Sequence, residues 1–370
     1  PYTESRRCNL WRFNTGGDVP DFHTNVDIGS HLGTHCECPY HHDSNWPSVA
    51  ELPLDQFMGR GIYCVLDLPE DHQITAADLE AAIGDRVQPG DTVVMEEPVH
   101  PDMSRAMELA GAKILTVPVD QDGMRVDLLE KLILHKHPRF IFVNSSFHDP
   151  TGHILSLERR KKIIEISNTY RVPIVEEDAA SELVYEGEKL PPIKAFDTLE
   201  NVIYIYSFSL TFVTGLSIAV VAANADVIRS LSYLVSVRLM ASDWMTQKLL
   251  GRYLDDGTYY KALDEFRASY SRKQRLVCEK LDEMAALGVS YERPRGGVYI
   301  WCRLPDGVDS KRFINRAYNM GLILIPGYVF YPFKNGGRNY VRINYSYESD
   351  ERLLAGMEVF RAALLESLEG

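Results

Sequence analysis

Short apolar segments alternate with longer helix-like segments through the middle of the chain, and this alternation limits the fold more than any other feature. Strands are expected at 91–95, 112–117, 139–143 and 172–175, with helices at 126–135 and 156–170. A helix between two strands carries the chain back along the sheet, so that the strands run parallel. The sequence therefore predicts an α/β fold with a mostly parallel sheet.

The flanking segments predict further parts of the fold. Apolar strands at 201–206 and 217–222 lead into long helices up to about residue 287, and the C-terminal residues read as a small α+β domain. The residues before the alternating region are β-rich, with few helices. Since 370 residues exceed the roughly 250–300 that share one core, several domains are expected. We predict boundaries at 1–88, 89–290 and 291–370.

Charge and composition exclude several classes of function. The formal net charge of -13 argues against sequence-independent binding to nucleic acid, which needs Lys and Arg to neutralise phosphates. No apolar stretch is long enough to span a bilayer. The six cysteines lack zinc-ribbon spacing, and no signal-peptide pattern opens the chain. We expect a cytoplasmic protein that acts on a small molecule, without nucleic-acid or membrane partners.

Seven short motifs follow one another in a fixed order from Pro89 onward. They are Pro89–Pro98, Phe147–Gly152, Val175–Leu183, Ser207–Phe212, Pro294–Tyr299, Pro326-Gly327 and Val341–Ser346. In this order and spacing they resemble the class I and II aminotransferases of fold type I, which use pyridoxal phosphate (PLP). The resemblance covers about residues 89–370 and implies a large α/β domain, a small C-terminal domain and a homodimer.

The same resemblance places four replacements at the PLP site. Leu210 takes the place of the lysine whose amine binds the PLP aldehyde in the family. Asp149 and Ala180 replace the Asn and Tyr that contact the ring hydroxyl, and a carboxylate at the first position repels a phenolate. Ser217 replaces the arginine that binds the phosphate. PLP is therefore not expected as a covalent cofactor.

Other residues of that site retain the family's residue types. Asp178, Ser207 and Ser209 match residues that contact PLP in the family. Arg342 matches the arginine that binds the substrate α-carboxylate, for which a planar guanidinium has the right geometry. The resemblance therefore implies a substrate that carries a carboxylate. A structural ion pair is the alternative role for Arg342.

The N-terminal segment contains a separate cluster of metal-ligand side chains. His31, His35, Glu37 and His41 all have odd numbers, so an extended segment places them on one face. Imidazole and carboxylate ligands suit Zn or Mn. The motif resembles that of the metal-dependent cyclase and kynurenine formamidase-like family over about residues 1–96, with Glu37 at the family's Asp position. A hydrogen-bonded histidine cluster without metal is the alternative.

These features lead to one main hypothesis of function. A metal at His31, His35, Glu37 and His41 polarises a carbonyl or a water, while Arg342 holds the substrate carboxylate. The protein would then be a metal-dependent hydrolase or cyclase acting on a small amino-acid-like carboxylate, built on a PLP-independent aminotransferase scaffold.

Three alternatives remain open. The first is a non-catalytic aminotransferase-like pseudoenzyme dimer. The second is a PLP-dependent aminotransferase with its lysine replaced, which binds PLP noncovalently. The third is a fusion of two unrelated families at the motif that both share, Pro89–Val93.

Overall fold

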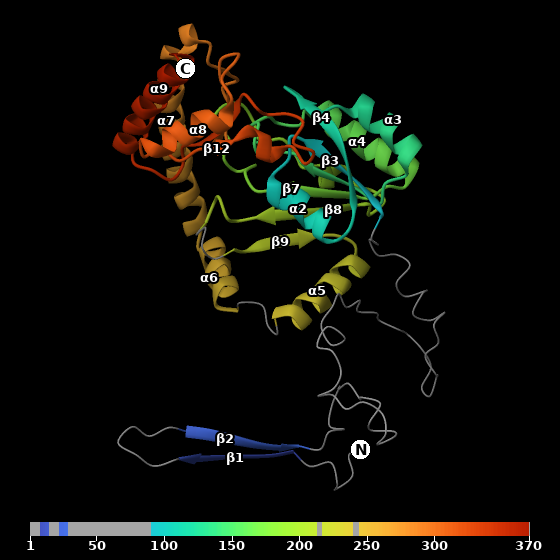
Figure 1. Ribbon diagram of the computed structural model, residues 1–370. Helices are drawn as coiled ribbons and strands as arrows, with labels where there is room; N and C mark the ends of the chain where they lie inside the picture. Colours follow the sequence, from blue (N-terminus) through green and yellow to red (C-terminus); the bar gives the residue numbers. More distant parts are fainter. Residues whose placement is uncertain (1–7, 15–21, 29–89, 213–216, 240–243, 370) are drawn as a thin grey trace, which may run out of the picture. The chain divides into compact units, whose positions relative to one another are not determined.

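The computed structural model describes residues 8–14, 22–28, 90–212, 217–239 and 244–369 (Figure 1). The chain divides into two units, Pro1–Arg86 and Val87–Gly370. In the first unit, strand β1 (Cys8–Asn14) pairs antiparallel with β2 (Phe22–Ile28). The histidine motif at 31–41 lies outside the described residues.

A seven-stranded sheet forms the centre of the second unit, and its strand order is β5-β4-β3-β6-β7-β8-β9. The inner strands β4, β3, β6, β7 and β8 run parallel, whereas β5 and β9 pair antiparallel at the two edges. This topology confirms the predicted α/β fold. The strands are β3 (Thr92–Glu97), β4 (Lys113–Asp120), β5 (Gly123–Met124), β6 (Phe140–Asn144), β7 (Ile174–Asp178), β8 (Val202–Ser207) and β9 (Ala219–Ala222).

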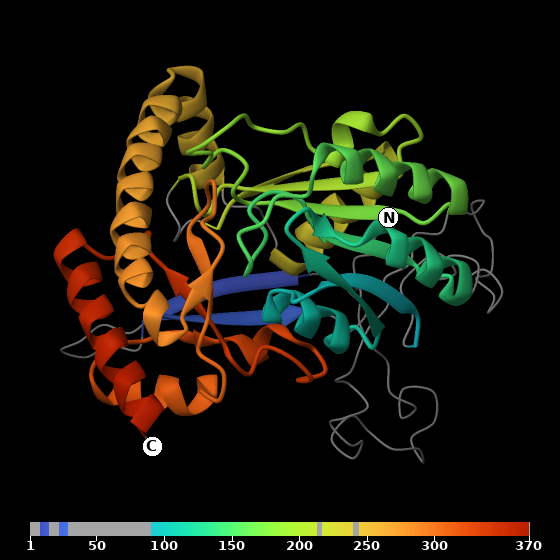
Figure 2. The same ribbon diagram turned by 90° about the horizontal axis from the view of Figure 1, so that it is seen from above.

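Helices cover both faces of this sheet because successive strand residues point to opposite sides. Val94 packs in one core with α3 (Val126–Lys136) and α4 (Leu157–Tyr170), which lie side by side (Figures 1 and 2). Its neighbour Val93 packs in another core with α2 (Pro101–Leu109). A short 3-10 helix, η3 (Ile193–Phe196), precedes β8.

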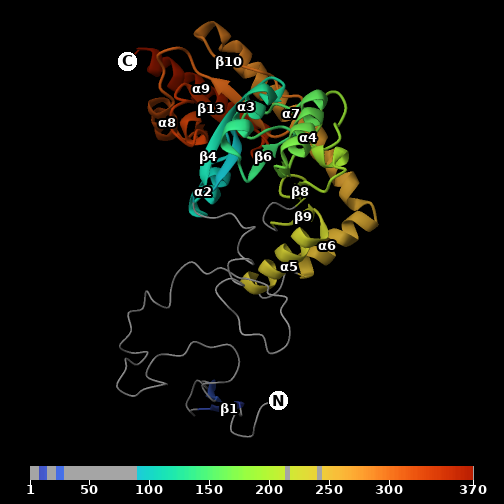
Figure 3. The ribbon, with the colours of Figure 1, turned by 90° about the vertical axis from the view of Figure 1, so that its right-hand side faces the viewer.

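Three helices follow the edge strand β9. Helices α5 (Ala225–Leu239) and α6 (Trp244–Asp255) lie at this edge of the sheet (Figures 1 and 3). The long helix α7 (Thr258–Glu283) then leads into the C-terminal region, followed by η5 (Ala285–Leu287). Among the described residues, no helix combines the length and the apolarity needed to cross a membrane.

The C-terminal region contains a four-stranded antiparallel sheet with the order β10-β11-β13-β12. Its strands and helices are β10 (Ser290–Tyr291), β11 (Tyr299–Arg303), α8 (Ser310–Asn319), β12 (Ile325–Pro326), η6 (Gly327–Phe330), β13 (Tyr340–Asn344) and α9 (Asp350–Glu369). Phe313 of α8 meets Phe360 of α9 edge to face, with ring centroids 4.9 Å apart. The strand expected at 321–325 pairs only at its end, since its first residue, Gly321, adopts a turn conformation with φ of 92°.

Candidate functional site

A cavity of about 510 Å³ lies where several parallel strands end. Its wall is formed by residues at or just after the C-terminal ends of β3, β6, β7 and β8, together with Val298 and Tyr299 at the start of β11. The carboxyl ends of neighbouring parallel strands meet at one edge of a sheet, where ligands bind in open α/β folds. The sheet topology thus brings distant segments of the sequence to one place.

The structure brings five of the eight residues expected at the PLP and substrate sites into the wall of this cavity. Those five residues are Asp149, Ala180, Ser207, Ser209 and Leu210. The other three, Asp178, Ser217 and Arg342, are not among the residues that line it. The expected metal ligands His31, His35, Glu37 and His41 lie outside the described residues.

Asp178 is buried and both of its carboxylate oxygens are already bonded within the protein. The Tyr204 hydroxyl donates to Oδ2 at 2.8 Å, and the Ser181 backbone N–H donates to Oδ1 at 3.0 Å. The β7 carboxylate that lines the cavity is instead that of Glu177, the residue before Asp178. Alternation along β7 explains the difference, since adjacent residues of a strand face opposite sides.

Glu177 was not among the site residues expected from the sequence, although its position in the strand could have indicated it. The Asn144 amide donates to Glu177 Oε2 at 3.2 Å. Burial raises the pKa of Glu177, and the Asn144 hydrogen bond opposes this shift. The side-chain oxygen of Asn144 is itself buried and has no hydrogen-bond partner in the protein. Glu177 and Asn144 therefore present two acceptors that a ligand N–H or O–H can satisfy.

Two serines lie at the C-terminal end of β8 in the cavity wall. The Ser207 hydroxyl donates to Ser209 Oγ at 3.0 Å, and the Ser209 backbone N–H donates to Ser207 Oγ at 3.3 Å. Leu210 comes next and packs against the apolar cluster that includes Phe208. Ser217 is exposed and has a φ of 45°.

Arg342 of β13 lies behind the cavity wall and is paired with an acid of the same chain. Its Nη1 donates to both carboxylate oxygens of Asp149, at 2.7 and 2.6 Å. The guanidinium lies 4.2 Å from the ring centroid of Tyr299 and 5.0 Å from that of Phe330. On the other side of Asp149, His100 Nε2 is 3.8 Å from Oδ2.

The loop that carries Asp149 is held in place by the buried Arg160 of α4. The guanidinium donates to the backbone oxygens of Leu155 and Pro191, each at 2.9 Å. It also donates to the Ser145 carbonyl and, at 3.0 Å, to the Ser146 hydroxyl. Burial lowers the pKa of Arg160, whereas the nearby carboxylate of Glu176 raises it.

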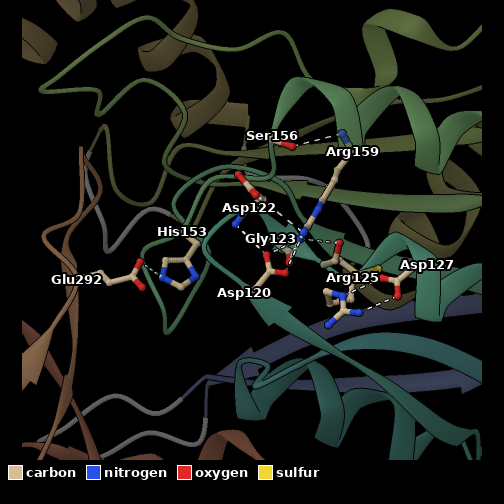
Figure 4. Close-up of polar contacts among 10 residues, drawn as sticks. Asp120, Asp122, Gly123, Arg125, Asp127, His153, Ser156, Arg159 and Glu292 are labelled. Atoms are coloured by element: carbon tan, nitrogen blue, oxygen red, sulfur yellow. Dashed lines mark hydrogen bonds and ion pairs between the residues drawn. The ribbon is translucent and has the colours of Figure 1, made fainter.

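Surface contacts support the same loop from outside (Figure 4). Arg159 Nη1 donates to Asp120 Oδ1 and to the Gly123 carbonyl, each at 2.6 Å, which joins the start of α4 to the turn between β4 and β5. His153 Nε2 lies 3.0 Å from Glu292 Oε2, close to β10. The loop between β6 and α4 is therefore fixed along its length.

Glu96 and His148 form a buried titratable pair behind the cavity. Glu96 Oε2 accepts a hydrogen bond of 2.7 Å from the Asn144 backbone N–H and lies 3.6 Å from His148 Nε2. Burial raises the pKa of Glu96 to about 8 and lowers the pKa of His148 to about 3. At neutral pH both side chains are therefore uncharged in the folded protein.

The free energy of unfolding of the wild-type protein is expected to fall between pH 6.5 and 8. Glu96→Gln is expected to abolish this fall. In that range the folded protein keeps the Glu96 proton, whereas the unfolded chain, with a pKa of 4.5, has lost it. Rising pH therefore lowers the free energy of unfolding, by up to about 2 kcal/mol over this interval. The His148 contribution changes only below its unfolded pKa of 6.5. Urea denaturation across this range measures the effect.

The exposed acid Glu188 provides the control for this experiment, because Glu188→Gln changes the same group at the surface. Its stability should depend on pH as that of the wild type does. Equal pH dependence in Glu96→Gln and the wild type would contradict a protonated Glu96 in the folded state.

Comparison with known families and structures gives two matches to family profiles. The profile described as "Aminotransferase class I and II" matches residues 70–359. The profile described as "Putative cyclase" matches residues 3–126. Both resemblances stated from the sequence are confirmed, and the larger match covers more than half of the chain.

Individual relatives and solved structures are aminotransferases. The chain is 28% identical over 288 residues to aromatic-amino-acid aminotransferase 1 of Thermococcus litoralis, covering 76% of this chain and 69% of the relative. The kynurenine aminotransferase of Pyrococcus horikoshii, solved with PMP, superposes with a TM-score of 0.73 at 29% identity, covering 77% and 71% of the two chains. The α-aminoadipate aminotransferase of Thermus thermophilus, solved with N-(5'-phosphopyridoxyl)-L-leucine, gives 0.72 at 28%, covering 76% and 73%.

These similarities contradict the main hypothesis drawn from the sequence. The expectation of a metal-dependent hydrolase or cyclase on a PLP-independent scaffold is wrong, since the similar proteins are aminotransferases. The cofactor expectation, a Zn or Mn ion with PLP not expected as a covalent cofactor, is contradicted for the same reason: two similar structures contain pyridoxyl compounds. Among the described residues, no group of His, Cys, Asp or Glu side chains could hold a metal ion.

Proposed function

Since the chain belongs to the class I and II aminotransferase family, we propose that its cavity binds a phosphopyridoxyl cofactor noncovalently and supports exchange of an amino group with a small molecule. The observation that carries this proposal is the cavity at the ends of β6, β7 and β8, with the Glu177 carboxylate in its wall. In many α/β folds such an edge binds the cofactor. Relatives named as aminotransferases support the class of reaction.

The residues of the cavity fit the parts of such a cofactor unequally. The Glu177 carboxylate and the unpaired Asn144 oxygen suit the N–H of a protonated pyridine ring. The hydroxyls of Ser207 and Ser209 can donate to phosphate oxygens, whereas the described part of the wall offers no lysine or arginine to the phosphate. No lysine is present among the described residues that line the cavity, so these residues offer no amine to bond the aldehyde form. The amine form, pyridoxamine phosphate, needs no such bond.

The bound cofactor would supply the carbon atom at which the amino group is exchanged. The side chains of this protein would bind and orient it: Glu177 would hold the ring nitrogen, and the apolar Leu210 would limit the access of water. His100 is the imidazole in the described wall and would be the candidate there for proton transfer.

Replacing Glu177 with Gln is expected to weaken binding of pyridoxamine phosphate about 10- to 100-fold. The neutral amide cannot form the charge-assisted hydrogen bond that a carboxylate makes to a pyridinium N–H, a loss of about 1.5–3 kcal/mol. Titration of the intrinsic fluorescence of pyridoxamine phosphate measures its affinity for the full chain. Glu188→Gln, at an exposed site, should bind it as the wild type does. No saturable binding by the wild-type protein would refute the proposed function.

We also propose that the protein forms a homodimer through the β9 edge of the sheet. Large apolar side chains are exposed there on β9, α5 and α6, and exposed patches of this kind commonly mark subunit interfaces. They include Val220 (53% exposed), Leu234 (41%), Trp244 (69%) and Met245 (73%).

The double substitution Trp244→Glu and Met245→Glu is expected to convert the dimer to a monomer. Two charges on each subunit would have to be buried without partners, which costs several kcal/mol. Sedimentation velocity measures the mass, and circular dichroism checks that the fold persists. Leu199→Glu is the control, because it places the same charge at another exposed apolar residue (60%), and it should leave the mass unchanged. A wild-type protein that sediments as a monomer would rule out the interface.

A further inference from the structure

The arginine expected to bind a substrate carboxylate already has a carboxylate partner within the chain. Arg342 Nη1 contacts both oxygens of Asp149, and the two side chains are only 10% and 16% exposed. The rings of Tyr299 and Phe330 cover the guanidinium. Arg342 is therefore neutralised and largely shielded from solvent.

A ligand in the cavity contacts Asp149, the acidic member of this pair, and not Arg342. Asp149 and Tyr299 are among the residues that line the cavity, whereas Arg342 is not. The described wall contains three carboxylates, those of Asp102, Asp149 and Glu177, and neither a lysine nor an arginine. His100 is its one other titratable side chain apart from Tyr299.

A negatively charged ligand and a positively charged ligand interact with this wall in opposite ways. A carboxylate would have to displace Asp149 from Arg342 and would leave Asp149 as a poorly hydrated carboxylate without its cation. An ammonium group can instead form charge-assisted hydrogen bonds to Asp149 while the Arg342 pair stays intact, because a carboxylate accepts several hydrogen bonds. The apolar side chains in the wall, including Met103, Phe147 and Val298, suit a hydrophobic body on such a ligand.

We infer that the cavity selects small molecules that present a primary ammonium group to Asp149, and not molecules held by an α-carboxylate at Arg342. This inference rests on the proposed function in one respect, that ligand and cofactor share the cavity. It gives Arg342 a positioning role: the guanidinium holds Asp149 toward the ligand. The substrate class is thus a primary amine with an apolar body.

Two probes that differ only in the charged group test this inference. Phenethylamine and phenylpropionate carry the same ring and linker, ending in an ammonium and a carboxylate respectively. Isothermal titration of the whole 370-residue wild-type chain, without added cofactor, is expected to give at least tenfold tighter binding of phenethylamine. Equal or tighter binding of phenylpropionate, or no binding of phenethylamine, would overturn the inference.

Asp149→Asn provides the second arm, because it removes the acid and frees Arg342. This variant is expected to bind phenethylamine at least tenfold more weakly and phenylpropionate at least tenfold more tightly. Asp127→Asn, which breaks the exposed pair of Asp127 with Arg125, is the matched control and should keep the wild-type preference. An unchanged preference in Asp149→Asn would also overturn the inference.

Binding of pyridoxamine phosphate, followed by its own fluorescence, separates this inference from the proposed function. Cofactor binding without amine preference would remove the inference and leave the proposed function. Amine preference without cofactor binding would remove the proposed function and leave the inference.

Discussion

The Leu210→Lys variant is expected to form a covalent adduct with PLP that borohydride makes permanent, whereas the wild-type protein forms none at this position. Residue 210 follows the two serines at the C-terminal end of β8 in the cavity wall, so a lysine there would project its amine into the proposed cofactor site. Desolvation favours the neutral, nucleophilic amine, although the nearby carboxylates oppose this effect. Mass spectrometry of the digested protein would find the modified peptide, with close to full occupancy.

Leu199→Lys introduces the same side chain at an exposed position outside the cavity. It should show only the background labelling that surface lysines give. If Leu210→Lys were labelled no more than Leu199→Lys while still folded, the cavity would not be the cofactor site.

The Arg160→Met variant is expected to lose about 3–5 kcal/mol of unfolding free energy. Arg160 is 1% exposed, and its removal leaves the buried Leu155 carbonyl without the guanidinium donor and takes one of two donors from the Ser145 carbonyl. It also leaves the buried Glu176 without the nearby cation that lowers its pKa. Removing one partner from a buried charge network has this cost even where the intact network adds little stability. Urea denaturation followed by circular dichroism measures the loss.

Arg125→Met is the control, because Arg125 forms an exposed ion pair, and exposed pairs contribute little to stability. Adding Glu176→Gln to Arg160→Met should recover part of the loss, since the second change removes the uncompensated charge. A loss below about 1 kcal/mol for Arg160→Met would contradict the structural role given to this network.

The α/β fold could be predicted from the sequence because buried parallel strands leave a local pattern. The apolar segment that begins at Asp91 became β3, and the segment at 172–175 became part of β7. These patterns involve only residues that are close together in the sequence. The order of the strands depends on contacts between distant segments, and the order was not predicted.

The site was only partly predictable for the same reason. Leu210 and Asp149 were expected at the cofactor site from motifs, and both line the cavity. The motif also predicted a cofactor contact for Asp178, whereas the orientation of β7 brings Glu177 to the wall. The pairing of Asp149 with Arg342 joins residues 193 positions apart, and no local pattern contains that information.

The pair of Asp149 and Arg342 also constrains the order in which these two positions can change. If Arg342 were replaced first, Asp149 would remain as a partly buried acid without its cation, and stability would fall. If Asp149 became Asn first, Arg342 would likewise lose its counter-charge, but the freed guanidinium would be able to bind a carboxylate ligand, which restores that charge. Any mutational path between an amine-binding and a carboxylate-binding form of this protein therefore begins at position 149.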